Sequence, residues 1–234
     1  MTGYLLWVVA GVVAAGLATR WQGRSFALEP ATRQEIALAA LLGALLGAHL
    51  LQLPADAFGW HAPPPPGLPA EVSPFGGRTV LGGLIGGWLA VEWQKRRLGV
   101  RSATGGGFAL PVALALGFGR LGCIAAGCCA GVECAPGWFA TTDVAGVPRV
   151  PVQAIEAGFH FVAAGLLALA ARRRWAQSRR LAIYFTAYAA LRFGLEFRRQ
   201  HPVVLLGLTW HQWLALVLFG IAGSTWWRRR VTGS

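Results

Sequence analysis

Arginines stand in or beside strongly apolar segments of this chain, where an unpaired charge is costly. Arg120 lies in the glycine-rich stretch 119–131, and Arg192 lies in the apolar stretch 181–197. On a helix, five side chains at spacings of four, four, four and three would share one stripe: Tyr184, Tyr188, Arg192, Glu196 and Arg199. Since these segments hold few carboxylates, a phosphate group is a suitable additional partner for the arginines.

Two further groups of residues have the chemistry to take part in such a site. Arg78 precedes Gly82 and Gly83 at the entry to an apolar segment, and the N–H groups of a helix start suit a phosphate when a guanidinium lies beside them. A glycine-packed helix end is the alternative interpretation of the same residues. Gln153 and Glu156, three residues apart at the start of another apolar segment, would share one face of a helix.

The carboxylates also allow a purely structural interpretation. Glu156 and Glu196 could simply neutralise Arg120 and Arg192, because membrane interiors usually hold ions as pairs. The arginines nevertheless outnumber the carboxylates in these segments, and the surplus positive charge favours an anionic ligand. In a membrane, an anionic phospholipid is the expected partner.

The cysteines fall within twelve residues of one another: Cys123, Cys128, Cys129 and Cys134. Their spacing lacks the paired C-x2-C arrangement of structural zinc sites, so we expect no metal there. Three interpretations remain open. Cys123 or Cys128 could form a disulfide with Cys134, the thiols could pack in reduced form, or one of them could be a nucleophile activated by Arg120.

Two histidines are candidates for proton transfer. His49 lies within an apolar segment and could act as an acid–base group, although hydrogen-bonded packing is the commoner role of such a histidine. His201 follows Arg198 and Arg199 at the expected outer boundary of the membrane, and we give it equal weight.

The elements that would position these residues are apolar and long. Of the 234 residues, 55% are hydrophobic and 13% are charged, which excludes an ordinary soluble enzyme. Seven segments are long and apolar enough to be helices that approach or cross the membrane: 3–19, 36–53, 79–93, 106–118, 152–171, 181–197 and 203–227. The sequence therefore predicts an all-α polytopic membrane protein with about seven transmembrane helices, forming one integral membrane domain over residues 1–234.

The glycines and loops add detail to this architecture. Four glycines in 119–131 predict a broken helix or a re-entrant segment buried in protein. We expect a proline-rich outer loop over 54–75 and a cysteine-containing outer loop over 119–150.

The basic residues predict the orientation of the chain in the membrane. If the seven segments alternate in direction, 15 of the 21 Lys and Arg residues fall on one side, which should be cytoplasmic. The N-terminus would then lie outside and the C-terminus in the cytoplasm. The net charge of +12 is explained by this distribution, so we expect no nucleic-acid partner.

Five stretches, in order from residue 76 to residue 213, resemble the landmarks of the prolipoprotein diacylglyceryl transferase family: GGRTVLGGLIGG, GRLGCIAAGCCAG, RVPVQAIE, YAALRFGLEFRRQHP and LTWHQW. The resemblance implies a multi-pass enzyme of the bacterial cytoplasmic (inner) membrane. Such an enzyme moves a diacylglyceryl group from phosphatidylglycerol to the lipobox cysteine thiol of a secreted prolipoprotein, and it releases glycerol 1-phosphate. It needs no metal or other cofactor.

The resemblance also implies roles for individual residues. Arg120 would hold the phosphate of the lipid, and Arg192 would assist the departing phosphate. Glu196 and Arg199 would brace Arg192. Together with Arg120, Arg192 and Glu196, we count His49 as a catalytic candidate, and we expect further substrate contacts from these residues: Arg78, Gly82, Gly83, Gly131, Gln153, Glu156, Tyr188 and Arg199.

The sequence also departs from the family pattern. Leu81 stands where the family usually has a histidine, and Cys123, Ala126 and Cys128 replace two asparagines and a glutamate. We therefore expect Arg192 to matter more for transfer than any histidine. A transferase of the same fold with another acceptor, such as a small thiol or a lipid, is the first alternative, and an anion carrier is the second.

Overall fold

The structure is a computed structural model that describes residues 2–22, 28–60, 78–143 and 145–231. Within these ranges the fold is built on seven long helices: α1 (Thr2–Trp21), α2 (Pro30–Leu50), α4 (Val80–Arg97), α5 (Gly105–Ala125), α6 (Val152–Arg172), α7 (Arg180–Glu196) and α8 (Trp210–Val231). The short elements are α3 (Leu53–Ala57) and two antiparallel pairs, β1 (Thr141–Thr142) with β2 (Pro148–Arg149) and β3 (Val203–Leu205) with β4 (Leu208–Thr209). The all-helical expectation is confirmed.

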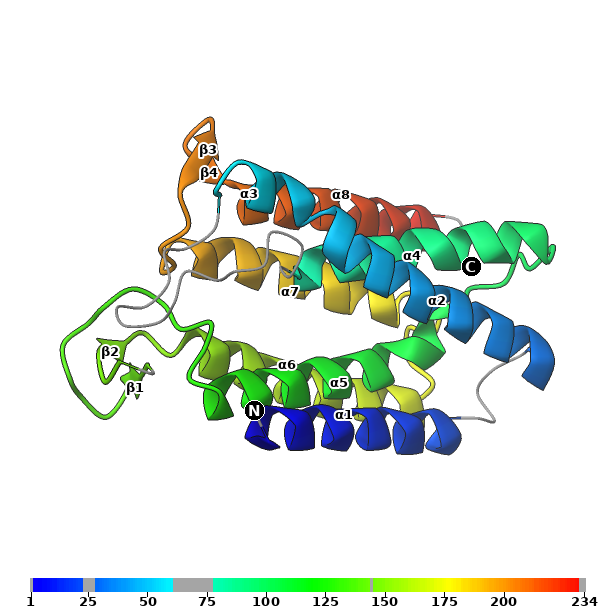
Figure 1. Ribbon diagram of the computed structural model, residues 1–234. Coiled ribbons are helices and arrows are strands. Elements are labelled where there is room, and N and C mark those ends of the chain that lie inside the picture. Colours follow the sequence, from blue (N-terminus) through cyan, green and yellow to red (C-terminus); the bar gives the residue numbers. More distant parts are fainter. Residues whose placement is uncertain (1, 23–27, 61–77, 144, 232–234) are drawn as a thin grey trace.

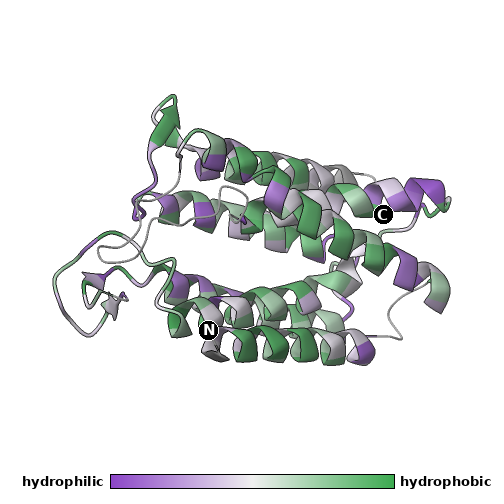
Figure 2. Ribbon diagram, viewed as in Figure 1, coloured by the Kyte–Doolittle hydropathy of each residue, from purple (hydrophilic) through white to green (hydrophobic). Residues whose placement is uncertain are grey.

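Four of the described helical segments are long and apolar enough to cross a membrane: Gly3–Trp21, Pro30–Ala57, Gly105–Ala125 and Val152–Arg172. Large apolar side chains cover the outside of these helices, with Leu6 70% and Val12 66% exposed. Such a surface suits lipid rather than water. Figure 2 shows the apolar residues along the helices and the hydrophilic ones concentrated toward the two ends of the bundle.

The helices alternate in direction and form two layers (Figure 1). In one layer α5 packs between α1 and α6, and in the other α2 packs on α4 while α7 packs on α8. Helix α7 also contacts α5 and α6, so it joins the two layers. The N-terminus lies at the end of the bundle that carries both strand pairs, which we call the hairpin end, and the C-terminus lies toward the opposite end.

Glycines bring α2 and α4 into backbone contact. A Cβ atom on Gly47 would lie 2.4 Å from the carbonyl oxygen of Gly82, and one on Gly86 would lie 2.3 Å from the carbonyl oxygen of Gly43. Within a membrane, where apolar burial gives little driving force, such close backbone packing is a main source of helix association. These four glycines therefore fix the α2–α4 pair.

Two segments differ from the sequence-based expectation. Helix α5 runs through Gly119 and Gly122 to Ala125, so the predicted break within 119–131 is instead a helix end, and the predicted outer loop over 119–150 begins only after residue 125. The helix stops there because Gly127, with φ +62°, takes the left-handed conformation that closes a helix.

The last apolar segment, expected as a helix from residue 203, begins with the β3–β4 hairpin. Leu206 and Gly207 form its two-residue turn with φ values of +51° and +76°, as a tight hairpin turn requires. Helix α8 starts at Trp210. In the proline-rich stretch 54–75, residues 54–57 belong to α3, and the part from residue 61 onward lies outside the described residues.

Candidate active site

The candidate site lies at the hairpin end of the bundle, where four helix ends meet. Helix α5 contributes Arg120 from its last turns, and α6 contributes Gln153 and Glu156 from its first turn. Helix α7 contributes Arg192 and Glu196 from its last turns. All five side chains are buried. Alternating helix directions therefore collect polar residues that are far apart in the sequence.

Glu156 is the centre of the site. Its carboxylate forms an ion pair with Arg120, and its Oε1 lies 3.5 Å from Arg192 Nε and 3.4 Å from Arg199 Nη2. Arg120 also donates a hydrogen bond of 3.5 Å to the Tyr188 hydroxyl. Arg120 and Arg192 therefore share the Glu156 carboxylate.

Glu196 organises the second half of the site. Its Oε2 lies 2.5 Å from Arg192 Nη1, while its Oε1 contacts His201 and accepts a 3.2 Å hydrogen bond from the Thr209 hydroxyl. His211 Nδ1 lies 3.6 Å from the same oxygen, and its ring stacks on His201 with 4.4 Å between centroids. The β3–β4 hairpin supplies Thr209 and leads into α8, so it closes the site over Glu196.

The cluster carries more positive than negative charge. Arg120, Arg192 and Arg199 face the carboxylates of Glu156 and Glu196, so one positive charge remains when the histidines are neutral. The buried Nε of Arg199 has no hydrogen-bond partner among the described residues. A buried donor without a partner costs roughly 1–3 kcal/mol, and an anionic oxygen would satisfy both this donor and the surplus charge.

Gln153 lies one residue after the start of α6. Its buried Oε1, like the Nε of Arg199, has no hydrogen-bond partner among the described residues.

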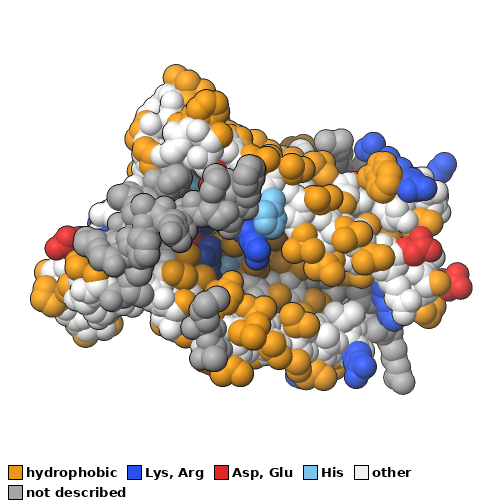
Figure 3. Space-filling model, in the orientation of Figure 1, with side chains coloured by type: hydrophobic (Ala, Val, Ile, Leu, Met, Phe, Trp, Pro, Cys, Tyr) orange, Lys and Arg blue, Asp and Glu red, His pale blue; other side chains and the backbone are white. Residues whose placement is uncertain are grey.

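Arg78 and His49 form a separate pair. Arg78 is exposed just ahead of α4, and its Nε donates a 3.2 Å hydrogen bond to His49 Nε2 on α2. His49 Nδ1 lies 3.0 Å from the carbonyl oxygen of Leu45. The Nε2 lone pair is therefore already occupied, and this geometry favours His49 as a residue that positions Arg78. The space-filling view in Figure 3 shows a hollow between the layers with basic and histidine side chains at its edge.

Three glycines expected among the substrate contacts lie in packing contacts instead. Gly82 and Gly83 are buried against α2, where added Cβ atoms would lie 2.5 Å from Gly47 O and 3.3 Å from Ala44 O. A Cβ on Gly131 would lie 2.5 Å from the carbonyl oxygen of Arg198. These close packing contacts explain why each of the three positions is a glycine, without any contact to a substrate.

The four cysteines are free, so the disulfide considered between Cys123 or Cys128 and Cys134 is not present. The sulfur atoms of Cys123, Cys128 and Cys129 lie within 4.8 Å of one another. Cys134 is absent from that cluster, and its backbone N–H bonds to Pro148 O beside the β1–β2 pair.

Sequence reasoning missed two features of the site. His160, fully buried, pairs its Nδ1 with the Tyr184 hydroxyl at 2.8 Å, and its ring lies 4.7 Å from that of Tyr188. Its position four residues after Glu156 on one helix was a usable signal. His211 was the second omission, and it enters the site because α8 begins one residue before it.

The fold and the site define a helical protein of the membrane with a buried arginine–carboxylate cluster at one end. Residues 1–228 match the family model described as prolipoprotein diacylglyceryl transferase, and the chain belongs to this family.

Two relatives carry names of the same kind. The phosphatidylglycerol–prolipoprotein diacylglyceryl transferase 2 of Clostridium perfringens is 31% identical over 144 residues, which cover 56% of this chain and 54% of the relative. The phosphatidylglycerol–prolipoprotein diacylglyceryl transferase of Frankia alni is 29% identical over 232 residues, which cover 93% of this chain and 60% of the relative. The chain thus spans between half and two thirds of the length of these relatives.

Proposed function

We propose that this protein transfers the diacylglyceryl group of phosphatidylglycerol to the lipobox cysteine thiol of a secreted prolipoprotein. The observation that carries the proposal is the buried cluster of three arginines and two glutamates, with its surplus positive charge and the unpartnered Nε of Arg199. A phosphodiester headgroup supplies the matching negative charge. The names of the two relatives point to the same substrates.

In the proposed reaction, the thiolate sulfur attacks the glyceryl carbon next to the phosphate oxygen. A carbon–sulfur bond forms as the carbon–oxygen bond breaks, and glycerol 1-phosphate leaves with the electron pair. Arg120 binds the phosphate, while Arg192 stabilises the negative charge that grows on the leaving oxygen. Glu156 contacts both guanidiniums and Glu196 contacts that of Arg192, so the two carboxylates hold the guanidiniums in place.

His201 is the group best placed to accept the thiol proton. Its Nδ1 contacts Glu196, an arrangement in which a carboxylate orients an imidazole and leaves Nε2 to act as the base. His201 is half-buried, in the segment between α7 and β3, where an acceptor peptide from the aqueous side could reach it. A thiol already ionises in part near neutral pH, so this base adds a modest share of the rate.

For the membrane topology we propose seven spans with the N-terminus outside and the C-terminus in the cytoplasm of a bacterial cell. Because the seven long helices alternate in direction, the end of the bundle opposite the hairpins holds the C-terminus of α1, the N-terminus of α2 and the loops 98–104 and 173–179. Most basic residues lie in or beside these loops or at the C-terminal end of α8, as the positive-inside rule requires of a cytoplasmic face. The candidate site then opens toward the outside, where prolipoproteins emerge.

The decisive experiment uses the purified full chain in phosphatidylglycerol-containing nanodiscs with a lipobox peptide. Mass spectrometry should show the peptide gaining one diacylglyceryl group, and glycerol 1-phosphate should accumulate in equal amount. A peptide with Ser in place of the lipobox Cys is the matched control and should stay unmodified. Absence of the adduct from an enzyme that still binds the lipid would refute the proposed acceptor.

A different acceptor on the same fold is the second candidate, favoured by the replacement of polar family residues. The side chains of Leu81 and Cys123 are buried and offer no acid–base group of the family kind. Adding a small thiol or a second lipid in place of the peptide tests this candidate directly. Anion transport is disfavoured because Arg120, Arg192 and Arg199 all lie at one end of the bundle.

A further inference from the structure

We propose that Cys123, Cys128 and Cys129 form a binding site for one thiophilic metal ion of the zinc class. Their three sulfur atoms lie within 4.8 Å of one another at the C-terminus of α5. The transferase chemistry proposed above makes no use of these thiols, and the metal site does not depend on that chemistry.

The backbone explains how two of the sulfurs meet. Cys128 N–H bonds to Cys123 O and Gly127 N–H bonds to Ile124 O, each at 3.0 Å, with φ +62° at Gly127. This pair of bonds is the Schellman closure of a helix, in which the side chain after the glycine contacts the residue five positions earlier. Here that contact joins Cys128 to Cys123. The helix cap itself therefore brings two thiols together.

A strained residue supplies the third sulfur. Cys129 has φ +63°, a left-handed conformation that a non-glycine residue rarely adopts and that costs of order 1 kcal/mol or more. This conformation accompanies the return of its thiol to the cluster. Strain of this kind persists where the surroundings require a particular side-chain position. Binding of one ligand by three thiols would require such a position of the Cys129 side chain.

The distances suit a metal. Zinc–sulfur bonds of about 2.3 Å place neighbouring sulfurs of a tetrahedral site roughly 3.8 Å apart. Sulfurs already within 4.8 Å need only small side-chain rotations to reach this spacing. Cys123 is buried, while Cys128 and Cys129 are exposed, so an ion can enter from the hairpin end and keep a fourth position for water.

The charges around the cluster favour the metal-bound form. The positive charges of Arg120 and Arg199 act on the Cys129 sulfur. Each thiol that ligates the ion releases its proton. Three thiolates around a divalent ion carry one net negative charge, which the neighbouring guanidiniums stabilise.

The proposed metal site differs from the sequence-based expectation of no metal. That expectation rested on the missing C-x2-C pairs and on the poor geometry of adjacent ligands. A helix end of the Schellman kind provides a different geometry, because it pairs positions five apart. The left-handed residue at 129 then separates the directions of the adjacent side chains.

The test measures metal binding by the full chain in detergent, purified under reducing conditions and stripped with a chelator. Cd²⁺ titration should give one equivalent per chain with the ultraviolet charge-transfer absorption of cadmium–thiolate bonds, and Zn²⁺ should displace the absorption. C123S, C128S and C129S should each lower the affinity at least tenfold. C134S, which removes the fourth cysteine but not a member of the cluster, should bind as the wild type does.

Several outcomes would overturn the proposal. They are binding of less than half an equivalent by the fully reduced chain, unchanged affinity in C129S, or equal loss in C134S. A Cys123–Cys128 disulfide found by peptide mapping, combined with no Cd²⁺ binding after its reduction, would replace the metal site by a redox pair. Circular dichroism of each variant shows that the helices remain, so loss of binding is not loss of fold.

Discussion

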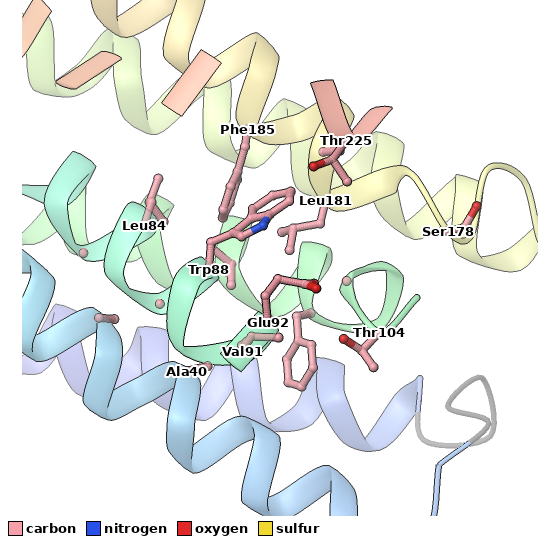
Figure 4. Close-up of a pocket in the computed structure, with 17 residues that line it drawn as sticks. Ala40, Leu84, Trp88, Val91, Glu92, Thr104, Ser178, Leu181, Phe185 and Thr225 are labelled. Carbon is pink, nitrogen blue, oxygen red and sulfur yellow. The ribbon is translucent and has the colours of Figure 1, made fainter. Parts of the chain in front are cut away.

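The two ends of the helix bundle differ in the side chains that they bury. At the hairpin end, Glu156 and Glu196 hold three arginines in a buried network of ion pairs. Toward the other end, a cavity of about 130 Å³ lies between α2, α4, α5, α7 and α8 and is lined largely by apolar side chains (Figure 4). Trp88 and Phe185 face each other there, with 5.6 Å between ring centroids.

This difference indicates that residues at the hairpin end serve activity and that residues around the apolar cavity serve stability. Charged groups in a low dielectric fix one another's positions strongly, which suits the proposed binding of a phosphate in one orientation. Apolar side chains around a cavity can rearrange, and they do not fix the orientation of a bound group. We therefore expect substitutions at the hairpin end to change activity with little change in folding, and substitutions at the apolar cavity to do the reverse.

The largest expected effect is that of Arg192→Ala. Arg192 touches both carboxylates and, in the proposed reaction, stabilises charge that grows during transfer, so its loss should lower kcat about a hundredfold to a thousandfold, or roughly 3–4 kcal/mol. Turnover of phosphatidylglycerol with a lipobox peptide measures this effect. Arg198→Ala is the control, because Arg198 is exposed on the same helix end, and it should keep near-normal turnover. An equal loss of turnover in both variants would mean that turnover depends on positive charge in general and not on Arg192 in this site.

At the apolar cavity, Phe185→Ala should act on stability. Phe185 is 4% exposed and packs against Trp88, and truncating a buried phenylalanine costs about 3 kcal/mol. A thermal shift assay in detergent should show a clear fall in Tm, while the folded fraction keeps its kcat. A selective loss of kcat with unchanged Tm would contradict the division of roles between the two ends.

A smaller effect is expected from His201→Gln. Because an unperturbed thiol with a pKa of about 8.5 is already a few per cent ionised at pH 7, loss of the base should cost about tenfold there. The defect should shrink as the pH rises toward 9, since hydroxide then ionises the thiol without help. His49→Gln is the matched comparison and should keep most of the turnover, because a Gln oxygen can still accept the hydrogen bond of Arg78. A larger defect in His49→Gln would make His49 the proton acceptor.

The smallest expected effect is a loss of stability of the β1–β2 hairpin at low pH. Hydrogen bonds from Arg149 Nε at 2.5 Å and from Val147 N–H hold the pKa of Asp143 below its ordinary value. The stabilisation is therefore complete at neutral pH and is lost as the pH falls below about 4, through the lowered pKa. Hydrogen exchange of the hairpin amides should speed up in that range. Asp143→Asn should remove this pH dependence, and a hairpin of unchanged protection at low pH would contradict the assignment.

Hydrophobic segments predicted the long helices, because a membrane requires about 20 apolar residues per span and offers few alternatives to a helix. The start of α8 was wrong by seven residues, although a local signal was present. Thr209 and Gln212 form a reciprocal capping box: Thr209 N–H bonds to Gln212 Oε1 at 2.9 Å, and Gln212 N–H bonds to Thr209 Oγ1 at 3.2 Å. The T-x-x-Q spacing is its sequence signature.

The site was predictable in part. The stripe on 184–199 and the pair Gln153 and Glu156 followed from helical spacing. The members of these two sets that make contacts in the cluster are Tyr188, Arg192, Glu196, Arg199 and Glu156. The pairs Glu156–Arg120 and Glu196–Arg192 are those of the purely structural interpretation of the sequence. The additional contacts of Glu156 with Arg192 and Arg199 were not predictable, because they depend on how α6 and α7 pack. The glycine-rich sequences gave the weakest guidance, since glycine serves equally for a phosphate cradle, a helix contact or a helix end.

The glycine contact between α2 and α4 also bears on how this sequence can evolve. At Gly47 and Gly86 the opposing atoms are all main-chain atoms of the other helix. A change at one position cannot be offset by a smaller side chain opposite, because no side chain stands there to shrink. These positions should therefore stay constant without covarying, and their constancy among relatives would report the spacing of two helices and say nothing about catalysis.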